Sequence, residues 1–254
     1  MIFTFLILLS CKKMEKSKSV YFTDANLETL VNDDFSVRAI TIDNGKIWYA
    51  ADNGKYGYYD LNTKTANQKV LVYKNIKPEF RSISSNGRSV FLLSVGSPAL
   101  LYRIEKSSNE ATIVYQENNK KAFYDSMQFW NDKEGIAMGD PTEDCLSVII
   151  TRDSGETWKK IPCDKMPKTV DGEAAFAASN TSLIINGNYT WMVSGGKNAR
   201  VFFSSDKGIT WDVYKSPIVQ GQEMTGIFSA HFYDENIGFL TGGNYEKPEQ
   251  KSGF

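Results

Sequence analysis

Histidine and cysteine are scarce in this chain of 254 residues. His231 is the one histidine, and the cysteines are Cys11, Cys145 and Cys163. A histidine-based catalytic triad or a metal site with several histidine ligands therefore has little to draw on. The sequence also lacks a CxxC pair, a haem-attachment motif and a strand-bound GxGxxG motif. We accordingly expect no metal site and no cofactor.

An excess of one charge and long apolar runs are missing as well. The 29 Lys and Arg nearly balance the 30 Asp and Glu, and no basic stripe is present, which argues against a nucleic-acid partner. No run approaches the ~18 apolar residues of a membrane-spanning helix, and no amphipathic pattern predicts a helix of more than about three turns. Hydrophobic residues still make up 41% of the chain, enough for a buried core.

Two stretches of eight residues share the pattern S/T-x-D-x-G-x-T-W, and each follows an apolar run. The shared positions are Asp153, Gly155, Thr157 and Trp158, and then Asp206, Gly208, Thr210 and Trp211. Asp can accept hydrogen bonds from backbone N–H groups in a turn, and Gly tolerates positive φ. Thr and Trp then open the next strand, where the indole can pack between neighbouring sheets. The pattern indicates a structural turn and carries no catalytic signal.

A wider repeat surrounds these two turns. Asp153 and Asp206 are 53 residues apart, and the run 129–139 matches the run 232–242 at a step of 103 residues, or about two units. Units of roughly 45–50 residues fit the four-stranded blades of a β-propeller. Short β-rich runs bounded by Gly, Asn and Asp favour strands over helices. We therefore predict an all-β propeller of about five blades, at about 36–75, 79–118, 122–165, 170–219 and 225 to the end.

Ring closure leaves two alternatives open. The fifth unit stops at Phe254, before any third copy of the turn pattern. Open sheet edges are liabilities, so a propeller needs a closed ring. We expect an incomplete C-terminal blade in a chain shortened from a six- or seven-bladed parent. The alternative is a five-bladed ring in which Val20–Val31 supplies the missing outer strand of the last blade.

The N-terminus has a different character. Ile2–Leu9 is an apolar run, and Leu8-Leu9-Ser10-Cys11 resembles a bacterial lipobox, in which the cysteine becomes the lipidated first residue of the mature protein. We interpret residues 1–19 as a lipoprotein signal with a polar tether and residues 20–254 as the propeller. This predicts a lipid-anchored protein of the cell envelope. An apolar N-terminus with an accidental cysteine is the alternative.

Cys145 and Cys163 lie symmetrically about Ser154, inside the first repeated turn. In an antiparallel hairpin they would face each other near its open end, close to disulfide reach. An oxidising envelope would permit the bond. Two free buried thiols remain the alternative.

The first residues of the innermost strands surround the mouth of a propeller's channel. Aligning these strands puts one residue of each blade in a shared second column: Arg38, Arg81, Asp125, Glu173 and Phe228. Polar groups that converge on a concave mouth form a default ligand site. Two cations and two carboxylates would suit a peptide terminus or an acidic sugar, so we predict a protein or glycan ligand. Alternatively, Arg38–Glu173 and Arg81–Asp125 pair and seal the channel. Separately, we expect the histidine, His231, to belong to the channel wall or the core.

The repeated turns resemble the Asp-box, or BNR repeat, of sialidase-like β-propellers. The runs 123–127, 139–141 and 172–176 are similar to envelope propellers of Bacteroidetes-type bacteria, which are grouped with photosystem II assembly-factor-like propellers. This resemblance covers nearly all of residues 36–245. Members are often labelled oxidoreductases, a label that no motif here supports. The assembly-factor relatives bind proteins, which implies a binding or assembly scaffold.

A glycoside hydrolase of sialidase-like architecture is the alternative function. That activity needs an arginine cluster, a tyrosine nucleophile and acidic helpers. Tyr102-Arg103-Ile104 is similar to the family's early Tyr-Arg-Ile-Pro motif, but Glu105 replaces the proline and the run falls on a predicted outer strand. We interpret this match as a coincidence and predict a binding module.

Overall fold

The computed structural model describes residues 24–177 and 180–249. The chain divides into two units, Met1–Leu30 and Val31–Phe254. The described part of the first unit, residues 24–30, contains no strand or helix, and every described strand belongs to the second unit. Cys11 and the predicted signal lie outside the described residues. Among those described, no helix has the length and hydropathy to cross a bilayer.

The first three sheets each consist of four consecutive antiparallel strands, which we call blades 1 to 3. Blade 1 consists of β1 (Val37–Asp43), β2 (Lys46–Ala51), β3 (Lys55–Asp60) and β4 (Thr65–Val70). Blade 2 consists of β5 (Phe80–Ser85), β6 (Ser89–Ser94), β7 (Ala99–Glu105) and β8 (Ala111–Glu117). Blade 3 consists of β9 (Tyr124–Phe129), β10 (Gly135–Gly139), β11 (Ser147–Thr151) and β12 (Lys159–Lys160).

The last two sheets are interleaved in sequence. Blade 4 consists of β14 (Leu183–Asn186), β15 (Tyr189–Val193), β17 (Arg200–Ser204) and β18 (Asp212–Lys215). Blade 5 is the sheet of β13 (Glu173–Ala174), β16 (Gly195–Gly196), β19 (Thr225–Phe232) and β20 (Gly238–Asn244). A short 3₁₀ helix (Cys163–Lys165) follows β12. The predicted all-β propeller with about five four-stranded blades is confirmed.

Tight turns explain why neighbouring strands pair in sequence order. Asn44 and Gly45 both have positive φ (47° and 72°) and join β1 to β2, where Asp43 pairs with Lys46. Two central residues at positive φ are the mark of a type I′ hairpin, whose twist matches that of the strands. Asn53 and Gly54 repeat these φ values between β2 and β3. Asn-Gly pairs thus determine the first two hairpins of blade 1.

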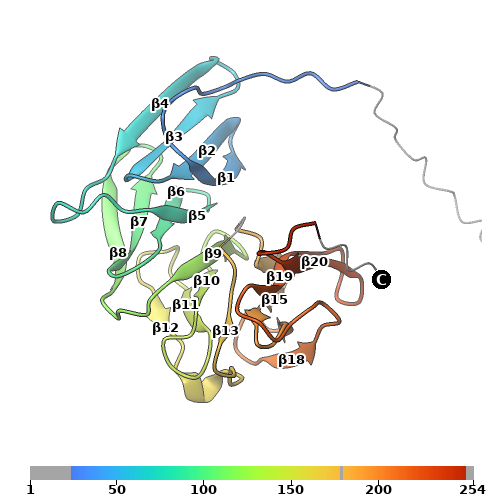
Figure 1. The fold of residues 1–254 in the computed structure, drawn as a ribbon. Helices are drawn as coiled ribbons and strands as arrows, with labels where there is room; N and C mark the ends of the chain where they lie inside the picture. The colour runs from blue at the N-terminus through green and yellow to red at the C-terminus, as the bar shows by residue number, and fades with distance from the viewer. Residues whose placement is uncertain (1–23, 178–179, 250–254) are drawn as a thin grey trace, which may run out of the picture. The chain divides into compact units, whose positions relative to one another are not determined.

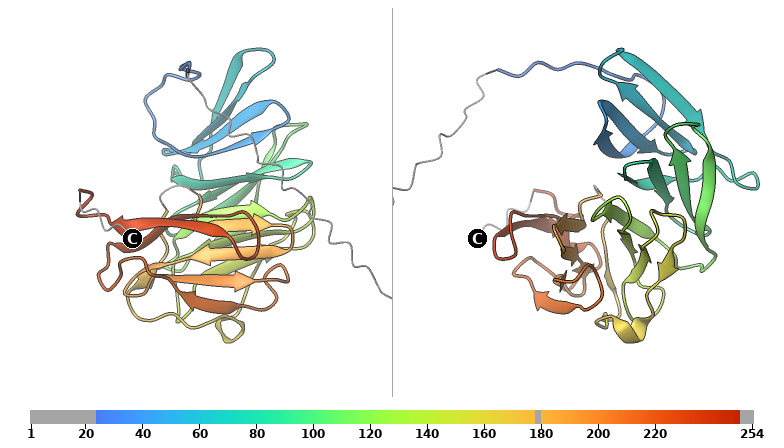
Figure 2. Two further views of the ribbon diagram at one scale, coloured as in Figure 1. Left: turned by 90° about the vertical axis from the view of Figure 1, so that its right-hand side faces the viewer. Right: turned by 180° about the vertical axis from the view of Figure 1, so that it is seen from behind.

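The blades succeed one another around a common centre within the unit Val31–Phe254, with each inner strand next to that of the following blade (Figure 1). The views from the side and from behind show the same succession (Figure 2). The hydrophobic core lies between the sheets. In one such cluster, Phe91 and Leu101 of blade 2 pack with Met127, Ile149 and Trp158 of blade 3. Alternate side chains of each strand therefore serve two different interfaces.

The start of blade 4 differs from the prediction. Its inner strand is β14, whereas the expected run 172–175 contributes β13, which pairs with Gly195–Gly196 in a different sheet. Residues 175–182 separate the two strands. Gly195 pairs with Gly226 in β19, and a Cβ atom on either glycine would collide with the backbone opposite. Two facing glycines therefore allow blade 5 to approach β16 this closely.

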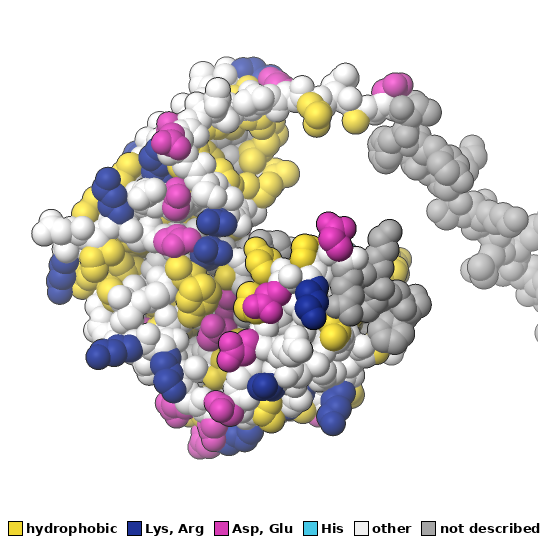
Figure 3. All heavy atoms as spheres, in the orientation of Figure 1, with side chains coloured by type: hydrophobic (Ala, Val, Ile, Leu, Met, Phe, Trp, Pro, Cys, Tyr) yellow, Lys and Arg dark blue, Asp and Glu magenta, His cyan; other side chains and the backbone are white. Residues whose placement is uncertain are grey.

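Apolar side chains are exposed at both ends of the blade series. On β1, Ile40 is 59% and Ile42 69% exposed, and on β20, Phe239 is 73% exposed. Hydrophobic side chains are visible beside β1 and β2 in the space-filling view (Figure 3). No strand involves residues 24–31, so the described part of the alternative outer strand at 20–31 is absent from blade 5. Residues 20–23 lie outside the described part of the chain.

Candidate functional site

A β-bulge marks the beginning of four inner strands. The pairing register of β1, β5, β9 and β19 shifts around a single residue. It is the second residue of the first three strands and the fourth of β19, and these residues are Arg38, Arg81, Asp125 and Phe228. A bulged residue is left unpaired in the hydrogen-bond ladder between the strands, and its side chain points in a new direction. Such bulges are often found beside functional sites. The column aligned from the sequence is therefore a repeated bulge position. Glu173 is the exception, since β13 carries no bulge.

Three of the bulge residues line one pocket, which we call the mouth pocket. Arg38 of blade 1, Arg81 of blade 2 and Phe228 of blade 5 lie on its wall, and its volume is about 560 Å³. The other lining residues are Phe123, Ala174–Ala177, Glu223, Met224 and Tyr245. Segments far apart in the sequence thus meet where the inner strands begin. Asp125 and Glu173 do not line this pocket.

The two arginines of the mouth pocket differ in their partners. Arg81 donates through Nε to Glu79 Oε1 at 2.9 Å, its Nη2 lies 2.8 Å from the same oxygen, and Nη1 donates to the Ala177 carbonyl at 3.3 Å. Arg38 is exposed, and its guanidinium has no hydrogen bond or ion pair with any residue in the ranges 24–177 and 180–249. Arg38 is therefore the guanidinium available to a ligand's carboxylate.

Aromatic rings form the apolar part of the same pocket. Phe176 and Phe228 meet edge to face, with ring centroids 4.8 Å apart and an interplanar angle of 80°. Tyr245 meets Phe228 in the same way at 6.2 Å. Edge-to-face pairs hold rings in a defined orientation. The mouth pocket therefore joins a free cation to an ordered apolar wall.

Asp125 is a buried carboxylate without a hydrogen-bond partner. Its side chain is fully buried, and neither oxygen has a partner among the described residues. Burial raises the pKa of Asp125 well above its ordinary value, the nearby Asp140 charge raises this pKa further, and Arg81 lowers it. Burial also raises the pKa of Asp140 to about 6, although its carboxylate accepts a hydrogen bond from the Ala175 N–H at 2.8 Å. The two carboxyl groups therefore titrate as a pair.

Sequence reasoning missed this pair. In the sequence, Gly139-Asp140-Pro141 follows a predicted strand and shows no link to Asp125. The adjacency of Asp125 and Asp140 depends on the pairing of β9 with β10, in which Gly139 lies opposite Tyr124. The signal that could have revealed it is the position of Asp140, one residue beyond a strand antiparallel to that of Asp125.

The expected position of Glu173 at the channel mouth is wrong. Its buried carboxylate accepts hydrogen bonds from Arg200 Nε at 2.8 Å and Nη2 at 2.6 Å, and from Ser194 Oγ at 2.6 Å. A buried carboxylate needs such bonds in place of its lost solvent, and Arg200 and Ser194 supply them. Glu173 lines a second pocket of about 470 Å³, with Asp140 and Asp171. Within the described chain, neither Arg38–Glu173 nor Arg81–Asp125 forms an ion pair.

The two repeated turns, 151–158 and 204–211, have the same geometry and are called repeat turns below. Each connects the third strand of its blade to the fourth. Asp153 accepts from the Thr157 N–H at 2.9 Å and hydroxyl at 2.6 Å, and Asp206 accepts from Thr210 at the same two distances. Gly155 and Gly208 have φ values of 83° and 81°.

The tryptophans of the repeat turns lie at successive blade interfaces. Trp158 is buried between blades 2 and 3, and Trp211 is partly buried between blades 3 and 4. The two indoles differ in one contact: Trp211 Nε1 donates to the Gly208 carbonyl at 3.3 Å, whereas Trp158 Nε1 has no partner among the described residues. Each turn thus anchors its blade to the one before it.

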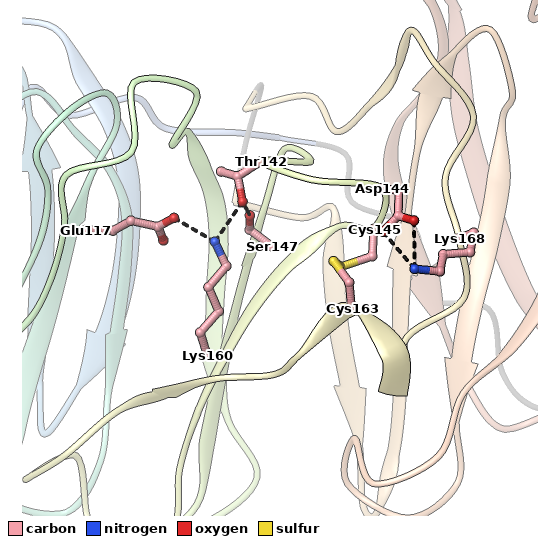
Figure 4. The surroundings of a disulfide bond; sticks show 8 residues. All are labelled: Glu117, Thr142, Asp144, Cys145, Ser147, Lys160, Cys163 and Lys168. Carbon is pink, nitrogen blue, oxygen red and sulfur yellow. Dashed lines mark hydrogen bonds and ion pairs between the residues drawn. A yellow bond between two sulfur atoms is a disulfide. The ribbon is translucent and has the colours of Figure 1, made fainter.

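Cys145 and Cys163 are joined by a disulfide, with their Cα atoms 5.5 Å apart (Figure 4). Both cysteines lie beyond the paired ends of β11 and β12, where Ile149 faces Lys160. Lys160 Nζ lies 2.6 Å from Glu117 of blade 2 and donates to Thr142 at 2.8 Å. The disulfide and these contacts hold the base of the hairpin that carries the first repeat turn.

Two other residues singled out in the sequence lie away from the mouth pocket. His231 is exposed on β19, so it does not belong to the core, and its place in the channel wall stays a prediction. Arg103 on β7 forms ion pairs with Glu105, at 3.2 Å, and with Glu156 in the first repeat turn. Its role is to tie blade 2 to blade 3. Among the described residues, no group of His, Cys, Asp and Glu is arranged to hold a metal ion.

No protein-family model matches this chain, and no curated protein matches it. Solved structures do match. The structure of U3-55K is 12% identical with a TM-score of 0.59, over 83% of this chain and 59% of that chain. The extracellular domain of the putative hybrid two-component system BT4673 from B. thetaiotaomicron is 14% identical with a TM-score of 0.54, over 85% of this chain and 27% of that chain. YCF48 bound to D1 peptide is 12% identical with a TM-score of 0.41, over 83% and 91%.

Identities this low show the fold alone. The chain spans about three fifths of the U3-55K chain that it matches. The likeness to U3-55K and to the BT4673 domain agrees with the arrangement of the blades. The chain has the fold of a β-propeller.

Proposed function

We propose that this propeller is a binding module that captures peptide segments of partner proteins in the mouth pocket. The observation that carries the proposal is the free guanidinium of Arg38 beside the edge-to-face rings of Phe176 and Phe228. A volume of about 560 Å³ is in the range of small-ligand pockets and accommodates a few side chains. Propeller neighbours found in complexes, including YCF48 with D1 peptide and the mitotic checkpoint complex, are compatible with this role.

The pocket's chemistry defines the peptide. A carboxylate, from an acidic side chain or a free C-terminus, pairs with Arg38, and an adjacent apolar side chain packs on the two phenylalanine rings. Arg81 already shares its charge with Glu79, so it orients the pocket more than it attracts the ligand. Binding by charge and rings suits capture or assembly. An acidic sugar, the other ligand expected from the sequence, would pair its carboxylate with Arg38 and would not need the apolar wall.

The test is selection from a random dodecapeptide display library on the wild-type protein. We expect enriched peptides to contain Asp, Glu or a free C-terminal carboxylate next to an apolar residue. Arg38→Ala should weaken their binding at least fivefold. Arg88→Ala is the matched control, because Arg88 is also exposed but lies in the turn between β5 and β6, away from the pocket.

Two results would overturn the proposal. Peptides that bind Arg38→Ala as tightly as wild type would exclude the mouth pocket as their site. Binding of N-acetylneuraminic acid, without enrichment of any peptide, would assign the pocket to a glycan. The sialidase-like run gives the hydrolase alternative no support, since its Arg103 is held by Glu105 and Glu156 outside the pocket.

We also propose that the module is held at the cell envelope by acylation of Cys11. The support is the apolar run Ile2–Leu9, the Leu8-Leu9-Ser10-Cys11 sequence and the polar residues that follow it. Wild-type protein should enter the detergent phase of a Triton X-114 partition, and Cys11→Ala should not. Wild-type protein with an intact N-terminus in the aqueous phase would contradict the anchor.

A further inference from the structure

An aromatic groove lies on the side of blade 4 that faces blade 5. Its volume is about 650 Å³, and Trp191, Phe203 and Phe232 line it together with Ser205 and Asn236. We call it the blade 4 groove. Only β19 and β20 of blade 5 lie against this side, and β20 is the edge of its sheet. The groove is separate from the mouth pocket.

Blades 2 and 3 have the same surface, and in each case a repeat turn of the following blade covers it. In blade 2, Phe91 contacts Trp158, with ring centroids 6.1 Å apart, and Gly155 lies directly on the Phe91 ring. In blade 3, a Cβ atom on Gly208 would lie 3.0 Å from Ile150 Cδ1 and 3.7 Å from Ile136 Cδ1. The turn of the following blade therefore rests on paired positions of the second and third strands.

The strand register identifies the corresponding pair in blade 4. Phe91 pairs with Arg103, Ile136 with Ile150, and Trp191 with Phe203. Trp191 and Phe203 are thus at the position where blades 2 and 3 carry a repeat turn of the next blade. Here the described residues supply no such turn, and Phe232 stacks on Trp191 at 4.4 Å with an interplanar angle of 5°.

A backbone anchor for such a turn is also repeated. Ser154 N–H donates to the Lys133 carbonyl at 2.8 Å, and Lys207 N–H donates to the Asn188 carbonyl at 3.1 Å. Both carbonyls belong to the turn between the first two strands of the blade concerned. Asn236 occupies this place in blade 5, two residues before Gly238 just as Lys133 is two residues before Gly135, and Asn236 lines the groove.

We propose that the blade 4 groove and the edge of β20 receive a β-hairpin built like the repeat turns of this chain. One strand of the hairpin pairs antiparallel with β20, and its turn places a tryptophan over Trp191 and Phe203. The hairpin adds two strands next to β20, at the edge of its sheet. It extends the existing interface in which Ile227 and Ala230 of β19 cover blade 4.

A second copy of the chain is a poorer occupant. Its own repeat-turn tryptophans, Trp158 and Trp211, are engaged in its own blade interfaces. A small apolar ligand would leave the N–H and C=O groups along the edge of β20 unpaired, whereas a strand satisfies them. A hairpin is the one occupant that meets both the groove and the edge.

The probe is a synthetic peptide of residues 145–163, closed by the Cys145–Cys163 disulfide, which contains the first repeat turn and Trp158. Titrated into the intact protein, it should bind with 1:1 stoichiometry. The same peptide with Trp158→Ala should bind at least tenfold more weakly, because a buried tryptophan is the usual centre of such an interface. Hydrogen exchange should slow at residues 238–244 of β20 when the peptide is bound.

A pair of protein variants tests the groove itself. Phe203→Glu puts a charge under the expected tryptophan and should abolish peptide binding, whereas Ile209→Glu, at a residue 68% exposed in the second repeat turn, should leave it unchanged. The peptide comparison needs only wild-type protein, so it remains decisive if Phe203→Glu unfolds. No binding, equal binding of the Trp158→Ala peptide, or protection confined to other strands would overturn the proposal. Concentration-dependent dimers that protect β20 without peptide would assign the groove to a second copy.

Discussion

Gly155 of blade 3 lies against the ring of Phe91 of blade 2, with no space for a methyl group between them. The φ of Gly155 is also positive, at 83°, a conformation that other residues adopt only with strain. Two separate constraints therefore meet at this glycine, one from the turn and one from the neighbouring blade.

Gly155→Ala should lower the free energy of unfolding by about 3 kcal/mol or more, since it combines the strain of positive φ with overpacking of the Phe91 ring. Gly96→Ala separates the two effects, because Gly96 has a φ of 77° and no heavy atom within 4 Å of the added Cβ. We expect this control to lose only about 1 kcal/mol in urea unfolding. Equal losses would show that Phe91 does not constrain the turn.

The two repeat turns should contribute equally to stability. Asp153 and Asp206 accept the same hydrogen bonds from Thr157 and Thr210 at the same distances. Asp153→Ala and Asp206→Ala should each lower the free energy of unfolding by about 1–3 kcal/mol, the usual loss when hydrogen bonds to a charged group are removed. Thermal and urea unfolding measure both variants. A large loss in one and none in the other would mean that only one turn supports its blade.

The Asp125–Asp140 pair should make the protein less stable as pH rises. Both pKa values are raised by folding, that of Asp140 from 3.8 to about 6, so the folded protein binds more protons than the unfolded chain above pH ~4. The free energy of unfolding therefore falls as pH increases from about 4 to beyond 6, by on the order of 3 kcal/mol for the shift of Asp140 alone. Urea unfolding at pH 4.5, 6 and 7.5 measures this slope.

Asp125→Asn removes one of the two buried charges and keeps the side chain's shape. We expect the variant to be more stable than wild type at pH 7.5, with the difference shrinking at pH 4.5. Asp60→Asn is a control of opposite sign, because hydrogen bonds from the Thr63 and Asn62 N–H groups lower the pKa of Asp60. A wild-type slope that Asp125→Asn leaves unchanged would contradict the role of the pair.

Reduction of the Cys145–Cys163 disulfide should destabilise blade 3. The bond joins residues 18 apart, and closing a loop of that size removes about 3 kcal/mol of unfolded-state entropy in the chain-entropy model. The Cys145→Ser, Cys163→Ser double variant should therefore unfold at lower urea concentration than the oxidised protein. Dithiothreitol should lower the midpoint of the wild type but not that of the variant. A midpoint unaffected by reduction would contradict this contribution.

Local signals in the sequence were sufficient for the architecture. A fixed step between turns predicts blades because each turn residue acts on its own neighbours: Asp153 bonds Thr157 four residues away, and Gly155 supplies positive φ by itself. The column aligned from the sequence coincides with a repeated bulge at Arg38, Arg81 and Asp125. The reason is again local, because a bulge depends on the residues of its own strand and the strand beside it.

The sequence by itself determined the repeat turns, most of the strands and four of the five positions in the aligned column, since these depend on interactions within a few residues. Only the tertiary structure decided what the charged residues do. Glu173 pairs with Arg200, 27 residues away, rather than with Arg38. Asp125 loses its solvent, and its nearest charged neighbours come from blade 2 and from beyond β10. Desolvation and charge pairing depend on which segments meet in space, and an alignment of the inner strands does not contain that information.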